Sequence, residues 1–401
     1  MARASVRKRN WVTGGKNRSA WVVDYTDEMG NRTQKSFKLK KEADLFRSSI
    51  VVDVLEGRHV SDKKSATMER VAQEFIDDAI LRSQAGHGVG ELYRRGREGY
   101  IRNHILPVVG DILQKDLGFN EGDAIARKMA KAGYKKVTIR EVLNTARQVC
   151  EFGIKRGYAK GQPFDAVLKD WRGGESDKIA TFSIEQIQQL IKTVDIRQPN
   201  VSIRSWLKLR IFVHSAVFCG LRFGEISGIT VQNVDLQNGI LRIRNSLTSL
   251  NELKGPKTRA GFRDVPMPQH VRALFTDWLD HHLIPDNRNL LFCKTQRSKM
   301  HDKTGSKGIT RADMHEVWRN LLIRAGLETE KKGPSYHFHA LRHFAASAMV
   351  GGGMPVTDVA KLLGHASFDM TLQRYAHPLL TEHKQQAEIQ KIASLMLPET
   401  D

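Results

Sequence analysis

A short polar segment with two adjacent glycines, residues 170–178, separates two long stretches of chain that carry apolar periodicity. Gly173 and Gly174 lie within it, and paired glycines in a polar stretch are typical of a hinge. The chain has 401 residues, which is too many for one small core and enough for two or three. The sequence therefore predicts a multidomain protein that divides near this segment.

Residues 1–60 predict a small α+β domain. Apolar and polar residues alternate over residues 21–26 and again over 33–39, as in β-strands, with turn residues between the two stretches. Residues 41–55 carry apolar side chains at helical spacing, and Gly57 follows as a stop signal. We therefore expect a small sheet with one helix.

The same section begins with a basic arm and has further basic residues near the predicted sheet. Because an exposed basic sheet face can enter a DNA groove, DNA contact is the favoured interpretation. A packing module with charged edges is the alternative. The candidate DNA contacts here are Arg18, Arg32, Lys35 and Lys38.

Residues 61–174 predict an all-α domain. Apolar residues recur at helical spacing near residues 71–79, 93–105 and 137–157, and no convincing strand pattern interrupts them. The second of these helices is expected to end near Pro107. The arginines of this section, among them Arg94 and Arg95, could contact phosphates, and they could equally form a solvated face.

Residues 175–401 predict a mainly α domain with a small β-sheet. Ser183 and Gln186 have the spacing of a capping box ahead of an apolar helix. A strand is expected at residues 240–244, and residues 255–266 are interpreted as a hairpin with Lys257 near its tip. A last helix is expected at residues 379–397, with Ile389, Ile392 and Leu395 along one side.

The charge of the chain indicates its partner class. Lys and Arg number 64 against 44 Asp and Glu, which gives a formal net charge of +20. Such an excess attracts a polyanion and releases its counterions on binding, so nucleic acid is the leading partner. A basic protein with a merely solvated surface is the alternative.

Cysteine usage and hydropathy argue against metal-ribbon, disulfide-rich, secreted and membrane-spanning proteins. Cys150, Cys219 and Cys293 lie far apart and form no CxxC pair, which argues against a zinc ribbon or a disulfide framework and fits a reducing compartment. The first ten residues lack the apolar run of a secretory signal. The most apolar stretch, residues 211–219, is too short to span a bilayer. We therefore expect a cytoplasmic chain with no membrane role.

The first candidate chemical motif is Gly220-Leu-Arg222-x-x-Glu225, at the end of an apolar helix. The planar fork of an arginine can give a phosphate two parallel hydrogen bonds, and a glutamate three residues on can orient it. The alternative for this spacing is an ordinary helix salt bridge with no role in chemistry.

The second motif is His339-x-x-Arg342-His343. A helix places residues three apart on one face, so His339 could move a proton beside a second phosphate-binding arginine, Arg342. A metal site from the two histidines is the alternative, but the motif lacks the glutamate of HExxH and any evident third ligand. No metal and no cofactor are therefore predicted.

Three further positions are weak signals when taken singly. Lys257 could be merely solvated, and Tyr375 could be a buried aromatic with a satisfied hydroxyl. His365 follows Gly364, which fits the end of a short helix.

Together and in this order, these motifs resemble the tyrosine recombinase (phage integrase) family. The matching local patterns are Gly-Leu-Arg-x-x-Glu, Lys-Thr-x-x-Gly-x-Arg-x-Val-Pro, His-x-Leu-Arg-His, Leu-Leu-Gly-His and Thr-x-x-x-Tyr, and the resemblance covers roughly residues 178–390. By position, residues 1–60 resemble the family's three-stranded arm-binding domain, residues 61–174 its helical (SAM-like) core-binding domain, and residues 175–401 its catalytic domain.

The resemblance implies an enzyme that cuts and rejoins DNA through a 3′-phosphotyrosine. It makes Tyr375 the nucleophile, Arg222 and Arg342 the phosphate clamps, and Lys257 the acid for the leaving 5′-oxygen. His339 would help to accept the tyrosine proton and His365 would bind the phosphate, with Glu225 and His343 as supporting residues. Arg259 is a further candidate DNA contact.

The resemblance also implies partners: double-stranded DNA with core-type and arm-type attachment sites, and a homotetramer on that DNA. The C-terminal segment is expected to pack on a neighbouring protomer. A directionality factor and a host DNA-bending protein could assist. The rival functions are a type IB topoisomerase, a non-catalytic DNA-binding regulator derived from an integrase, and a metal-dependent nuclease.

Overall fold

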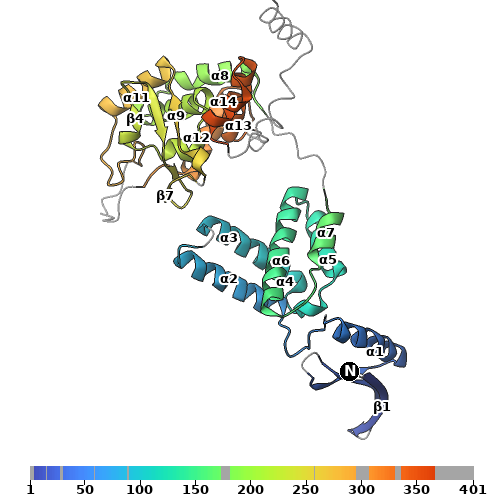
Figure 1. The fold of residues 1–401 in the computed structure, drawn as a ribbon. Coiled ribbons are helices and arrows are strands. Elements are labelled where there is room, and N and C mark those ends of the chain that lie inside the picture. The colour runs from blue at the N-terminus through green and yellow to red at the C-terminus, as the bar shows by residue number, and fades with distance from the viewer. Residues whose placement is uncertain are drawn as a thin grey trace, which may run out of the picture. The chain divides into compact units, whose positions relative to one another are not determined.

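The computed structural model describes residues 4–14, 16–27, 30–57, 59–87, 90–172, 181–256, 258–294, 307–329 and 336–365. The chain forms two compact units, Met1–Asp177 and Lys178–Asp401. The division lies within the polar segment 170–178 (Figure 1). Among the described helices, none is long and apolar enough to cross a membrane.

The first unit begins with a three-stranded antiparallel sheet in the order β1-β2-β3. The strands are β1 (Ala4–Thr13), β2 (Lys16–Thr26) and β3 (Arg32–Phe37), and α1 (Lys40–Leu55) follows them. Val23 and Tyr25 pack in one cluster with Ala43 and Ile50, so α1 covers one face of the sheet. The alternation in the sequence located β2 and β3, whereas most positions of β1 are basic or polar and show no such pattern.

The rest of the described part of this unit is helical, as predicted. Its α-helices are α2 (Met68–Gln84), α3 (Glu91–Tyr100), α4 (Leu106–Val109), α5 (Phe119–Lys131), α6 (Lys136–Arg156) and α7 (Phe164–Asp170). Their core gathers buried residues such as Ile105, Leu143 and Phe164. The helix expected to end near Pro107 runs on to Val109 through a π-turn at Ile101–Ile105. Pro107 lies just beyond this π-turn, as the second residue of α4.

Helices dominate the second unit, around a small antiparallel sheet in the order β4-β5-β8 (Figure 1). Its helices are α8 (Ile184–Asp195), α9 (Ile203–Phe218), α10 (Phe223–Ser227), α11 (Gln269–His281), α12 (Arg311–Arg324), α13 (His339–Gly351) and α14 (Val356–Leu363). Its strands are β4 (Val234–Asp235), β5 (Ile240–Ile243), β6 (Ser246–Leu247), β7 (Leu253–Lys254) and β8 (Arg263–Pro266). The predicted capping box is confirmed, because Ser183 and Gln186 exchange reciprocal hydrogen bonds.

Among the described residues of this unit, one large core and a smaller cluster of Ala346, Val359 and Leu363 are buried, and α9 is buried along most of its length. Phe212 of α9 packs on Phe223 and Phe292, with ring centroids 5.2 Å apart in each pair. Burying such rings removes a large apolar area from water. The buried helix fixes the turn after its last residue, and the first candidate motif lies in that turn.

The interpretation of residues 255–266 as one hairpin is wrong. β6 pairs with β7 in a two-stranded hairpin, a 3-10 turn follows at Arg259–Gly261, and β8 then pairs with β5. Leu241 and Val265 lie opposite each other in this ladder and are both fully buried. Packing of these two apolar residues under the sheet, rather than local turn chemistry, decides the partner of β8.

Candidate active site

Arg222 lies in the tight turn between α9 and α10. Gly220 makes this turn possible, because its φ is +65° and a Cβ there would lie 2.4 Å from the side chain of Leu363. The carboxylate of Glu225 accepts the backbone N–H of Arg222 at 2.9 Å and its guanidinium Nη1 at 2.8 Å. The Arg222 side chain nevertheless stays 38% exposed, so its guanidinium is bound to Glu225 through Nη1 and is still accessible to a ligand.

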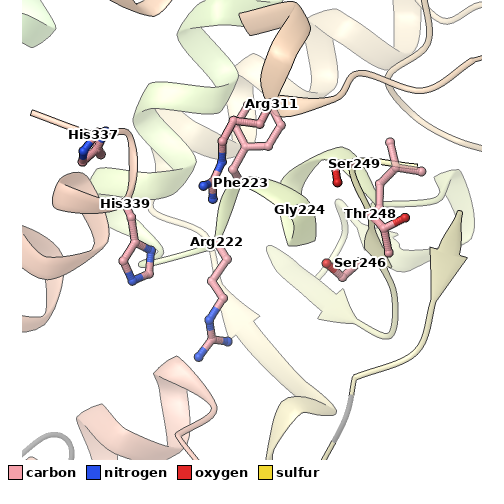
Figure 2. Close-up of a pocket in the computed structure, with 10 residues that line it drawn as sticks. Arg222, Phe223, Gly224, Ser246, Thr248, Ser249, Arg311, His337 and His339 are labelled. Atoms are coloured by element: carbon pink, nitrogen blue, oxygen red, sulfur yellow. The ribbon is translucent and has the colours of Figure 1, made fainter. Parts of the chain in front are cut away.

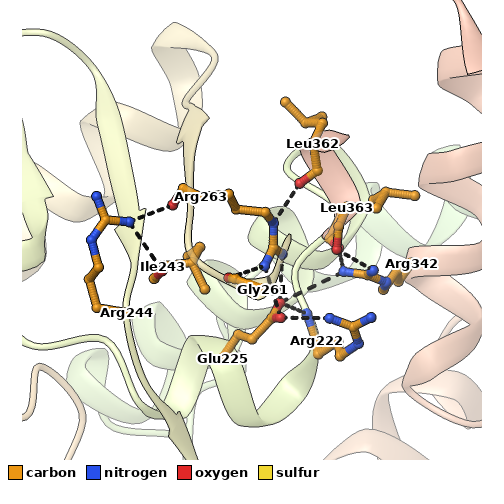
Figure 3. A network of polar contacts seen from close by, with 10 residues as sticks. Arg222, Glu225, Ile243, Arg244, Gly261, Arg263, Arg342, Leu362 and Leu363 are labelled. Atoms are coloured by element: carbon orange, nitrogen blue, oxygen red, sulfur yellow. Dashed lines mark hydrogen bonds and ion pairs between the residues drawn. The ribbon is translucent and has the colours of Figure 1, made fainter. Parts of the chain in front are cut away.

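Glu225 lies at the centre of a buried network of arginines (Figure 3). Besides Arg222, it receives hydrogen bonds of 3.1 and 2.8 Å from the two terminal nitrogens of Arg263, and Nη1 of Arg342 lies 3.7 Å away. Burial alone would raise the pKa of Glu225, but the Arg263 hydrogen bonds and the three positive charges lower it to about 2. Glu225 therefore contacts three arginines, whereas the ordinary helix salt bridge that was the alternative interpretation would involve Arg222 alone.

Arg342 occupies the first turn of α13 and is almost completely buried, at 2% exposure. Its guanidinium donates to the carbonyl oxygen of Gly220 at 2.7 Å and to that of Leu363 at 2.5 Å. It thus joins the turn before Arg222 to the end of α14. The two arginines of the predicted clamp therefore differ: Arg222 has an accessible guanidinium, and Arg342 fills the base of the site.

His339, one turn before His343 on α13, lines the same cavity as Arg222 (Figure 2). The two histidine rings meet edge to face, with centroids 4.6 Å apart. Burial, followed by the nearby His343 and the positive charges of Arg342, Arg222 and Arg311, lowers the pKa of His339 to about 3. The ring is therefore neutral at physiological pH, and the negative charge of a bound phosphate beside it would raise this pKa and make the ring a better proton acceptor.

His365 follows the end of α14, where Gly364 adopts the left-handed conformation expected of a helix C-cap, with φ +69°. The backbone N–H of His365 donates to the carbonyl of Ala360 at 3.0 Å. Arg342 and Arg263 each hold a carbonyl of the residues just before it. The structure thus brings the turn that carries His365 to the same network as Arg222.

Lys257, Tyr375 and the predicted helix 379–397 lie outside the described residues. The residues on either side of Lys257 are described, however, and both line a second cavity of about 430 Å³ that also includes Arg222 and Glu225. Pro256 and Thr258 therefore place this loop at the edge of the same network. Arg259 begins the 3-10 turn that follows and is exposed.

The cavity beside Arg222 and His339 measures about 770 Å³ and has other polar residues that the sequence analysis did not select (Figure 2). Its described lining contains two arginines, two histidines and no carboxylate, which suits an anion. The unselected polar residues are Ser246, Thr248, Ser249, Arg311 and His337. Arg263 was also overlooked, although it belongs to the Lys-Thr-x-x-Gly-x-Arg pattern and could have been noticed there.

The candidate DNA contacts of the sheet do not share one face. In the strand register Arg18 lies opposite Trp11, on the same face as Val22 and away from α1. Lys35 lies opposite Val23, on the face that α1 covers, with its ammonium 4.9 Å from the Phe46 ring centre. We call the face opposite α1 the arginine face, and its exposed members are Arg7, Arg9, Arg18 and Arg32.

Asp24 organises the arginine face. Its carboxylate accepts Arg7 at 2.7 Å and lies 3.6 Å from Arg32. Lys38 is exposed just after β3. On α3, Arg94 and Arg95 each pair with a glutamate four residues away, Glu98 and Glu91. Such i,i+4 pairs are usual on a solvated helix face.

Within the described residues, no three His, Cys, Asp or Glu side chains are grouped so that they could hold a metal ion. The described cavity offers instead arginines, neutral imidazole and hydroxyls. These groups can bind a phosphate, move a proton and stabilise developing negative charge.

Comparison with known proteins agrees with this chemistry. The model of the phage integrase family matches residues 181–382. A XerC-like tyrosine recombinase of Caldanaerobacter subterraneus subsp. tengcongensis is 22% identical over 395 residues, covering 92% of this chain and 95% of the relative.

Two solved structures share the fold. The integrase of transposon Tn1549, in complex with a circular intermediate DNA, superposes with a TM-score of 0.66 at 19% identity, covering 82% of this chain and 100% of that one. A lambda integrase tetramer bound to a Holliday junction gives a TM-score of 0.56 at 14% identity, covering 89% and 95%. The family model matches half of the chain, and the site is rich in arginine. The chain therefore belongs to the phage integrase family and is a site-specific tyrosine recombinase of the integrase type.

Proposed function

We propose that this recombinase cleaves DNA by attack of Tyr375 on a scissile phosphate held in the cavity beside Arg222 and His339. The observation that carries the proposal is the sharing of one cavity by an accessible arginine and a neutral histidine, without a carboxylate in its described lining. A phosphodiester is an anion that repels nucleophiles, so neutralising its charge is the main catalytic task.

The two arginines take different parts in this proposal. Arg222 binds a non-bridging oxygen directly, since its tip reaches the cavity. Arg342 adds positive charge beneath the phosphate and holds the carbonyls of Gly220 and Leu363. We assign the second phosphate contact to Arg342, as the family resemblance implies. His365 would hydrogen-bond the phosphate from the end of α14.

The proton steps balance without an added cofactor. The Tyr375 oxygen forms a bond to phosphorus while its proton passes to the neutral His339, with His343 holding that ring. The bond from phosphorus to the 5′-oxygen breaks, and Lys257 donates the proton that this oxygen needs. The products are a 3′-phosphotyrosine and a free 5′-hydroxyl. Because the covalent intermediate keeps the bond energy, a second 5′-hydroxyl can reverse the step on a new partner.

Strand exchange between two duplexes requires four active sites, so we propose a homotetramer on DNA. The lambda integrase tetramer on a Holliday junction, which shares this fold, supports the assembly. We assign residues 175–401 to catalysis, 61–174 to core-type sites and 1–60 to arm-type sites. In this proposal the protein integrates or excises a mobile element in the cytoplasm of its host. A directionality factor and a host DNA-bending protein are candidate accessory proteins.

The test is covalent capture on a nicked suicide duplex that carries the candidate attachment site, in the presence of a chelator. Wild type should form a protein–DNA adduct that survives a denaturing gel, and Tyr375→Phe should form none. Tyr336→Phe is the matched control, since Tyr336 is a tyrosine of the same unit whose hydroxyl bonds to Gln186. It should form the adduct as wild type does.

Three results would count against the proposal. An adduct with Tyr375→Phe would move the nucleophile to another residue. Cleavage that yields no adduct and is abolished by the chelator would indicate a metal-dependent nuclease. Tight binding to the attachment site with no adduct would mean a DNA-binding protein that does not cut.

A further inference from the structure

Two arginines bond to consecutive carbonyls at the end of α14. Nε of Arg263 donates to the carbonyl oxygen of Leu362 at 2.6 Å, and Nη2 of Arg342 donates to that of Leu363 at 2.5 Å. The last carbonyls of a helix have no partner within the helix and carry its negative dipole end. The two guanidinium groups therefore satisfy and neutralise this end just before His365.

Arg263 also holds the residue that orients Arg222. Its two terminal nitrogens bind the two oxygens of Glu225, and the same carboxylate bonds to the backbone and side chain of Arg222 (Figure 3). Arg342 approaches Glu225 only to 3.7 Å. The bonded path from the Arg222 side chain to the end of α14 thus runs through Glu225 and Arg263, whereas Arg342 joins the backbone of the same turn to α14.

Close packing makes this path stiff. The side chains of Arg263 and Glu225 are 6% and 8% exposed. A Cβ at Gly364 would lie 3.0 Å from Nη1 of Arg263 and 2.9 Å from the carbonyl oxygen of Ala260. Gly364 therefore lets the turn before His365 rest directly on the Arg263 guanidinium.

We propose that Arg263 is a positioning residue for DNA cleavage, which fixes Arg222 and His365 relative to each other through Glu225 and the Leu362 carbonyl. The inference rests on the proposed function, in which Arg222 and His365 bind the scissile phosphate. Arg263 itself is buried, and it lines neither of the two cavities that Arg222 lines. Its effect should therefore fall on the rate of the chemical step and leave DNA affinity unchanged.

An arginine is needed because hydrogen bonds to Glu225, to the Leu362 carbonyl and to the Gly261 carbonyl diverge from one planar group. Two parallel N–H groups meet the carboxylate of Glu225, while Nε points to the Leu362 carbonyl. A lysine at position 263 would keep the charge but could not reach all three partners with this geometry. Small errors in placing groups around a reacting phosphate cost about 10- to 100-fold in rate.

The experiment measures single-turnover cleavage of the nicked suicide duplex at saturating protein, with DNA affinity and the urea unfolding midpoint measured in parallel. Arg263→Lys should lower the cleavage rate constant about 10- to 100-fold, with the same final adduct amplitude and a DNA Kd within about twofold of wild type. Arg244→Lys is the matched control. Arg244 directly follows β5, bonds to the Arg263 and Ile243 carbonyls and to Asp264, and should keep the wild-type rate constant.

A second measurement separates positioning from folding. If Arg263 acts partly through Arg222, the rate loss from Arg263→Lys should be smaller in an Arg222→Lys background than in wild type. A wild-type rate constant for Arg263→Lys would overturn the inference. So would a loss confined to adduct amplitude with a lowered unfolding midpoint, since that is the mark of fewer folded molecules. Absence of the wild-type adduct would instead refute the proposed function.

Discussion

The Arg342 guanidinium donates a hydrogen bond of 2.7 Å to the carbonyl oxygen of Gly220, a residue 122 positions earlier and two residues before Arg222. This contact joins α13 to the turn after α9, and the bond from Arg342 to Leu363 joins both to α14. Three helices that contribute to the site thus meet at one buried guanidinium. The arrangement predicts different consequences for the two clamp arginines.

Arg342→Ala should destabilise the fold far more than Arg222→Ala. Removing the buried Arg342 leaves two carbonyls and part of the charge of Glu225 uncompensated, which should cost about 3–5 kcal/mol. Arg222 is partly exposed, so its loss should cost about 1 kcal/mol or less, while cleavage should fall about 100-fold or more. Urea unfolding and suicide-substrate cleavage measure the two effects. Equal unfolding free energies for the two variants would contradict the assignment.

The lowered pKa of His339 predicts a pH dependence of stability. The folded state holds this pKa at about 3, whereas an unfolded histidine has its usual pKa of 6.5. Between these values the unfolded state binds the extra proton, so the contribution of His339 to stability is lost as pH falls from 6.5 towards 3.

The matched variant for this effect is His339→Gln, which cannot take up the proton. Its unfolding free energy should decrease less steeply than that of wild type as pH falls through this window. Urea melts at several pH values between 6.5 and 4 provide the measurement. Parallel curves for the two proteins would show that His339 is not buried as the structure has it.

Arg311, at the start of α12, should contribute to DNA binding. It lines the cavity that contains Arg222 and is exposed. Arg311→Ala should weaken DNA binding and lower the slope of log K against log salt by about 1. Arg324→Ala is the control, since Arg324 ends the same helix and donates to the Thr193 carbonyl. Equal salt slopes for wild type and Arg311→Ala would remove Arg311 from the binding surface.

The arginine face of the N-terminal sheet should carry the DNA contacts of residues 1–60. Arg18→Ala should weaken binding of the full chain to duplex DNA and reduce its salt dependence, because Arg18 is exposed on that face. Lys35→Ala should leave binding unchanged and cost only about 0.5–1 kcal/mol of stability, because Lys35 rests on Phe46. Mobility-shift titrations at several salt concentrations compare the two. A larger loss of DNA affinity from Lys35→Ala than from Arg18→Ala would place the DNA on the face of the sheet that α1 covers.

Much of the local structure was predictable because its causes are local. The capping box at Ser183 and Gln186 and the glycine cap at Gly364 depend on residues within a few positions of one another. The same holds for the helical face that carries His339 and Arg342. The position of β1 was not predicted, because its exposed basic positions give no apolar alternation. Only its pairing with β2 defines it as a strand.

The sequence by itself determined the family, the order of the motifs and the residue types of the site, since these are properties of short stretches of chain. Only the tertiary structure decided which arginine is open and which is buried, that β8 pairs with β5, and that Arg263 joins Glu225 to the end of α14. The physical reason is distance along the chain. Burial and buried ion pairs depend on segments dozens to more than a hundred residues apart, whose meeting no local pattern records.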